Sequence, residues 1–160
     1  KADYDEYTSD VAYTNATAMF INTAKDFHDC GVNIDKSRYK FEQMRGEMQN
    51  IETLVIEPLI SKAQADSIKA EVLEDDVSAA NNLILPLIKK AIANHTAYKS
   101  GMGENYKVTG DNYLAEIRRI IEATPENYPD YEASDSYEED KTTNFYENKE
   151  TNTSFTFGHP

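Results

Sequence analysis

Apolar residues recur at three- and four-residue spacing through most of the chain, and this spacing constrains the fold more than any other feature. It places apolar side chains on one face of an α-helix, whereas a half-buried strand requires alternation. The sequence therefore predicts an all-α fold, a bundle of about five helices followed by an extended, mostly irregular C-terminal arm. The expected divisions are a loose lead-in over residues 1–8, a helical domain over 9–123 and the arm over 124–160.

The first helix is expected to begin at Ser9 or Asp10, whose short side chains can cap free amides of the first turn. Gly31 is expected to stop it in a left-handed conformation. Its apolar stripe is Val11, Ala16, Met19, Phe20, Thr23, Phe27 and Cys30.

The second helix is expected to open at Asn33 or Asp35. Because proline disfavours helical geometry at the residue before it, this helix should end or kink at Pro58. Its stripe is Phe41, Met44, Met48, Ile51 and Val55.

A capping-box pattern over Ser61–Gln64 predicts a third, short helix. Its expected apolar face is Ala65, Ile68 and Val72, with Leu73 beside them. An acidic break at Glu74–Asp76 follows.

The next helix is expected within Val77–Ser100. It either restarts at Asn82, with Pro86 in its first turn, or continues with a kink at Pro86. Its face is the most hydrophobic in the chain and is expected to form the central core: Ile84, Leu87, Ile88, Ala91, Ile92 and His95.

The last helix is expected after Gly101–Gly103 and a turn at Thr109–Asp111, with Asp111 as its cap. Thr124 and Pro125 should end it. Its stripe is Leu114, Ile117, Ile120 and Ile121.

The residues after Pro125 differ in composition from those before. The last 35 hold nine acidic and two basic residues, so their net charge is −7, and they lack Val, Ile and Leu. Such a segment cannot bury enough aliphatic surface to fold alone. We expect it to be ordered only where a partner or the helical body supplies that surface. Its expected partner-binding residues are the aromatic Phe145, Tyr146, Phe155 and Phe157.

The formal net charge of −13 makes several partners unfavourable. It repels a phosphate backbone, which argues against nucleic-acid binding, and it disfavours an anionic membrane surface. The chain has no apolar run long enough for a transmembrane helix, and its single cysteine excludes an internal disulfide. The expected partners are therefore other proteins.

No residue pattern predicts a catalytic, cofactor or metal site. Asp26, His28, Asp29 and Cys30 cluster, but consecutive helical residues diverge, so only Asp26 and Cys30 should share a face. His95 lies on an apolar stripe, which favours a core or core-edge histidine over a general base.

Two further segments lack the ligand pattern of a binding loop. Glu74–Asp76 lacks the spacing of a calcium loop, and Gly101–Gly103 follows a helix without the lysine of a phosphate loop. Both are expected to be connections between helices, and we predict no enzyme activity.

Four segments of the chain form a recognisable series: Ile51–Ile60, a helix running into a proline; Leu87–Tyr98, an alanine-rich helix; Tyr113–Ile117; and Phe155–Phe157. Together they resemble a family of short helical head–tail connector, or neck, proteins encoded in phages and prophages of Bacteroidetes. Ser61 stands where that pattern usually has glycine.

The resemblance implies a structural virion protein, made in the bacterial host cytoplasm. Its implied partners are further copies of the chain, possibly in a ring, and portal or tail proteins. The alternatives are an uncharacterised bacterial helical binding protein, possibly exported to the cell envelope, and an enzyme with His95 as base.

Overall fold

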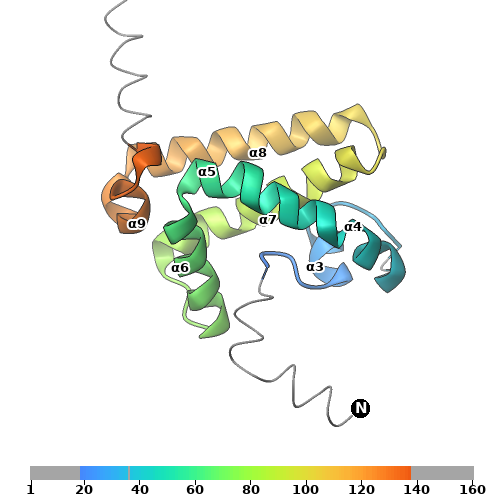
Figure 1. Ribbon diagram of the computed structural model, residues 1–160, viewed down its shortest axis with the longest axis horizontal. Helices are drawn as coiled ribbons and strands as arrows, with labels where there is room; N and C mark the ends of the chain where they lie inside the picture. The colour runs from blue at the N-terminus through green and yellow to red at the C-terminus, as the bar shows by residue number, and fades with distance from the viewer. Residues whose placement is uncertain (1–18, 36, 138–160) are drawn as a thin grey trace, which may run out of the picture.

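The computed structural model describes residues 19–35 and 37–137, and this part of the chain is all-α, as expected (Figure 1). A π-helical segment, η1, interrupts the α-helices, and a 3-10 turn, η2, follows the last long one. The elements are α3 (Ala24–Asp29), α4 (Arg38–Ile51), η1 (Glu52–Ile56), α5 (Glu57–Ile60), α6 (Lys62–Leu73), α7 (Ala79–Lys99), α8 (Glu104–Ala123), η2 (Pro125–Asn127) and α9 (Pro129–Glu132).

Helix α7 forms the centre of the core, as its apolar face predicts. The Ser78 hydroxyl caps its start, and Gly101, with a φ of 80°, follows its end. The helix runs continuously through Pro86, so the alternative restart at Asn82 is wrong. Its buried residues are Asn81, Ile84, Ile88, Ala91, Ile92, Ala93, Asn94, Thr96 and Ala97.

Helix α8 contradicts the expected turn at Thr109–Asp111, because the helix already starts at Glu104 and includes all three residues. Gly110 instead permits a close contact between two helices. A Cβ atom at Gly110 would lie 2.7 Å from Cδ2 of His95 on α7. Gly110 thus lets α7 and α8 approach, and Asp111 caps nothing.

The N-terminal helix is much shorter than its apolar stripe suggests. Met19–Asn22 are not helical, and α3 begins at Ala24 after the capping residue Thr23. The expected caps Ser9 and Asp10 lie outside the described residues. Gly31 ends the segment with a φ of 84°, as expected.

The start of α4 differs from the prediction, and the start of α6 matches it only in part. The cap of α4 is Ser37, not Asn33 or Asp35, and its side chain accepts a hydrogen bond from the Lys40 amide. At α6, the Ser61 hydroxyl accepts from the Gln64 amide as expected. The Gln64 side chain instead donates to Asn81 of α7.

The face of α6 is also only partly buried. Ala65 and Ile68 are in the core, but Val72 and Leu73 are 39% and 45% exposed. These two residues belong to the last turn of the helix, just before the acidic break. The prediction that Val72 lies on the buried face is therefore wrong, whereas Leu73 was expected only beside that face.

The helical body continues past residue 123 into the segment expected to form the arm. Tyr128 and Tyr131 are fully buried, and the Tyr128 hydroxyl donates to the Ala80 carbonyl at 2.9 Å. The Ser61 hydroxyl donates to the Asp130 carbonyl at 3.2 Å, which fixes α9 at the start of α6. Tyr128 and Tyr131 thus pack where the helical body supplies apolar surface.

Candidate functional site

An open apolar groove lies between the η1–α5 segment and α8. It has a volume of about 450 Å³ and is lined by Leu54, Val55, Pro58, Leu59, Leu114, Ala115 and Arg118. Leu59 is buried, whereas Leu54 is 72% exposed. In Figure 1, α4 and α5 form a nearly continuous rod that lies beside α8. We call this surface the α5–α8 groove.

The π turn explains why leucine is exposed here. In η1 the Glu57 amide donates to the Glu52 carbonyl, five residues back, so the turn holds one more residue than an α-helical turn. The buried face therefore shifts by one position. Ile56 is completely buried, whereas Val55, expected on the core stripe, is only half-buried.

Pro58 follows directly after this wider turn. Proline lacks an amide hydrogen and crowds the carbonyl four residues back. The wider turn accommodates it, so the helical path continues to Ile60 rather than ending at Pro58. Turns of this kind occur often at functional sites in helices, which makes the groove a reasonable candidate site.

A buried ion pair holds the π turn in place. The Glu52 carboxylate accepts a hydrogen bond from the Phe20 amide at 2.6 Å and another from Lys69 Nζ at 2.8 Å. The side chains of Glu52 and Lys69 are 6% and 17% exposed. The Lys69 ammonium also lies 4.9 Å from the centre of the Phe20 ring. Three chain segments therefore meet at the first residue of η1.

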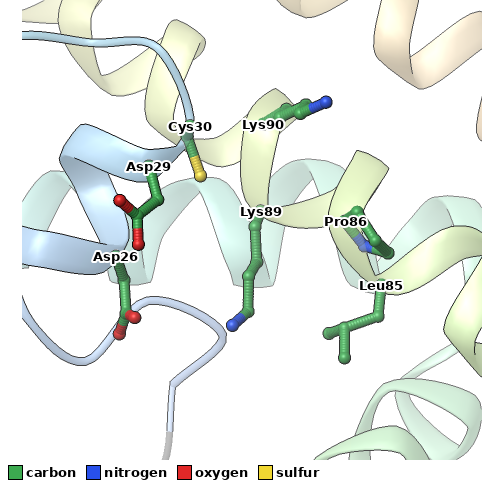
Figure 2. Close-up of a pocket in the computed structure, with 7 residues that line it drawn as sticks. All are labelled: Asp26, Asp29, Cys30, Leu85, Pro86, Lys89 and Lys90. Atoms are coloured by element: carbon green, nitrogen blue, oxygen red, sulfur yellow. The ribbon is translucent and has the colours of Figure 1, made fainter.

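A second, smaller cleft of about 280 Å³ separates α3 from α7. It is lined by Asp26, Asp29, Cys30, Leu85, Pro86, Lys89 and Lys90. Figure 2 shows the Lys89 side chain running along the cleft, with Lys90 turned the other way. Both carboxylates already have partners: Asp26 accepts from the Asn22 and Thr23 amides, and Asp29 pairs with Lys25 at 2.7 Å.

The thiol in this cleft is not activated. Burial raises the pKa of Cys30 to about 11, with Lys89 opposing the shift, so the group is protonated at neutral pH. A protonated thiol is a poor nucleophile and a poor metal ligand. Asp26, Asp29 and Cys30 line this cleft, whereas His28 is exposed and does not line it. Within residues 19–35 and 37–137, no three or more His, Cys, Asp or Glu side chains could together hold a metal ion.

His95 packs between α7 and α8, and its side chain is 12% exposed. Its Nε2 lies 3.2 Å from Asp111 Oδ1, but the two groups are not aligned for a hydrogen bond. Asp111 in turn pairs with Lys107 at 2.7 Å. Burial lowers the pKa of His95, while Asp111 opposes that effect and Lys107 and Lys99 add to it. His95 lines neither the groove nor the α3–α7 cleft.

The two expected connecting segments lie where the sequence placed them. Glu74–Asp76 joins α6 to α7, is exposed, and contains Asp75 with a φ of 56°. Gly101–Gly103 joins α7 to α8, and both glycines have positive φ. Each joins two helices, and the second connects the packed pair α7 and α8.

The predicted binding residues Phe145, Tyr146, Phe155 and Phe157 lie outside the described residues. The groove residues Leu54 and Leu114 were not singled out for binding from the sequence. Leu114 lies on the predicted apolar stripe of its helix. It lines a groove because the η1–α5 segment lies beside it. Only the position of Pro58, which predicts a helix irregularity, could have drawn attention to Leu54.

Comparison of the chain with protein-family models, curated proteins and solved structures gives no match. No helix in the described part of the chain combines the length and apolarity that crossing a membrane requires.

Proposed function

We propose that this chain is a structural virion protein of the head–tail connector or neck type, which works through protein–protein contacts. The observation that supports the proposal is the α5–α8 groove, an open apolar surface in a chain with a net charge of −13. Contiguous apolar surface of this kind is typical of contact sites.

The energetics favour occupation of the groove. Burying a leucine side chain fully contributes about 1.5–3 kcal/mol, so covering the largely exposed Leu54 contributes on the order of 1–2 kcal/mol. Leu114 and Val55, which are half-buried, add apolar area beside it. A partner that covers all three residues gains more binding free energy than it would from single apolar residues scattered over the surface.

The proposed partners are further copies of the chain, arranged in a ring, and portal or tail proteins. The net charge disfavours direct binding to a phosphate backbone, which is consistent with a role based on protein contacts. The resemblance of Ile51–Ile60 to connector proteins covers η1 and α5, the segment that forms one wall of the groove.

Native mass spectrometry and negative-stain imaging of the full chain test this proposal. We expect closed oligomers for the wild type, and monomers for Leu54→Asp, because a carboxylate in an apolar contact loses its hydration. The matched control is Leu83→Asp, since Leu83 is also an exposed leucine, at 62%, but does not line the groove. A wild-type chain that stays monomeric and binds neither portal nor tail proteins contradicts the proposal.

A further inference from the structure

We propose that the α5–α8 groove receives the distal part of the C-terminal arm, residues 138–160, of a neighbouring copy, with Phe155 and Phe157 as the inserted side chains. This inference depends on the proposed function, because it names the contact by which the copies assemble.

The described part of the chain ends on the side of the molecule where the groove begins. The Ser61–Asp130 hydrogen bond holds α9 beside the residue that follows α5, three positions after Pro58. The Tyr137 ring then packs edge-on against Tyr131, with their centres 5.5 Å apart. The arm therefore starts next to the η1–α5 wall of the groove.

The arm is long enough to leave its own body. Phe157 lies 20 positions after Tyr137, and an extended chain covers about 3.3 Å per residue, or about 65 Å in all. Helix α8, with 20 residues, is about 30 Å long at 1.5 Å per residue. The arm can thus reach the groove of a second copy.

The chemistries of arm and groove complement each other. Residues 138–160 have no Val, Ile or Leu, so their large apolar side chains are aromatic. The groove offers leucine surface from two sides, and Arg118 lies in its wall. Aromatic rings give a large contact area and pack on both aliphatic and guanidinium groups.

The residues just before this segment, 126–137, already show this mode of packing within the body. Tyr128 and Tyr131 belong to the acidic stretch without Val, Ile or Leu, yet both are fully buried against the helical body. Phe155 and Phe157 would repeat that packing on another copy.

A contact between arm and groove joins two different surfaces of identical chains. Such head-to-tail contacts generate rings when the rotation closes, whereas a contact of groove with groove would stop at a dimer. The inference therefore accounts for ring assembly as well as for the exposed leucine.

Disulfide trapping in full-length chains tests the contact. In a Cys30→Ser background, one chain carries Leu54→Cys and a second carries Phe155→Cys, and the two are mixed and mildly oxidised. We expect a mixed disulfide dimer, at a yield at least about tenfold above that for Leu83→Cys with Phe155→Cys; tenfold corresponds to about 1.4 kcal/mol.

Other occupants give different products. Leu54→Cys chains that crosslink with each other indicate a groove-to-groove dimer, and a double variant that closes only within one chain indicates that the arm occupies its own groove. Either result overturns the inference. If the oligomer forms but no trap forms, the arm–groove contact is wrong and the proposed function stands; if no oligomer forms, the proposed function fails.

Discussion

Helix α8 has two neighbours, and the contacts on its two sides differ. Against α7 the contact is closed: Gly110 accommodates the His95 ring, and Ile117 and Ile121 are completely buried. Against α5 it is open: Leu114 and Ala115 line a groove with the exposed Leu54. The same helix thus completes the core on one side and leaves an open apolar surface on the other.

The difference arises from the backbone of the neighbouring helix. Helix α7 passes Pro86 without leaving α-helical geometry, so its apolar stripe stays in phase and meets α8 along its length. The α4–α5 segment widens at η1 before Pro58, and its stripe shifts by one residue. A shift of one residue rotates side chains by about 100°, which moves Val55 away from the core and Ile56 into it.

The largest predicted effect tests this shift. Ile56→Ala should lower the free energy of unfolding by about 2–5 kcal/mol, the usual cost of truncating a buried isoleucine. At protein concentrations too low for assembly, Leu54→Ala should change the free energy of unfolding by less than about 0.5 kcal/mol, because the side chain is exposed in the single chain. Chemical denaturation followed by circular dichroism measures both.

Val55→Ala is the informative control for this pair. A helix without the π turn would bury Val55 on the stripe of Met48 and Ile51, and its truncation would then cost more than that of Ile56. A larger loss of stability for Val55→Ala than for Ile56→Ala contradicts the shift of the buried face by one residue.

The sequence predicted the closed side of α8 better than the open side. The stripe of α7 and the buried pair Ile117 and Ile121 follow from helical spacing, which depends only on local sequence. Gly110 was misread as a turn residue because Thr-Gly-Asp favours turns in isolation, whereas its role depends on His95, fifteen positions earlier.

The π turn could not be predicted from periodicity, because contacts distant in sequence stabilise it. Glu52 is fixed by the Phe20 amide and by Lys69, which lie 32 and 17 residues away along the chain. The burial of Tyr128 likewise needs the Ala80 carbonyl, 48 residues earlier. The unpredicted features thus depend on tertiary contacts and the predicted ones on local pattern.

The next effect concerns the closed side. Gly110→Ala should destabilise the wild type by about 1–3 kcal/mol, because the new methyl group overlaps the His95 ring. In a His95→Ala background the same change should stabilise by about 0.8–1 kcal/mol, since alanine is the better helix former. A double-mutant cycle by chemical denaturation measures the change of sign, and equal effects in both backgrounds would show that His95 does not restrict this position.

The smallest predicted effect is a pH dependence of the closed side. Burial lowers the pKa of His95 below its ordinary value of 6.5, so the unfolded chain binds this proton more readily than the folded one. The contribution of the neutral His95 ring to folding stability is therefore fully present above pH 6.5. It declines as the pH falls toward the pKa that His95 has in the folded chain. The charged groups at this position are Asp111, which opposes the shift, and Lys107 and Lys99, which strengthen it. Thermal unfolding of the wild type and of His95→Gln between pH 7.5 and 5 isolates the contribution, because the two chains differ only at this side chain. We expect the wild type to lose more stability than the variant over this range, and parallel curves would mean that the α7–α8 contact tolerates the charged ring.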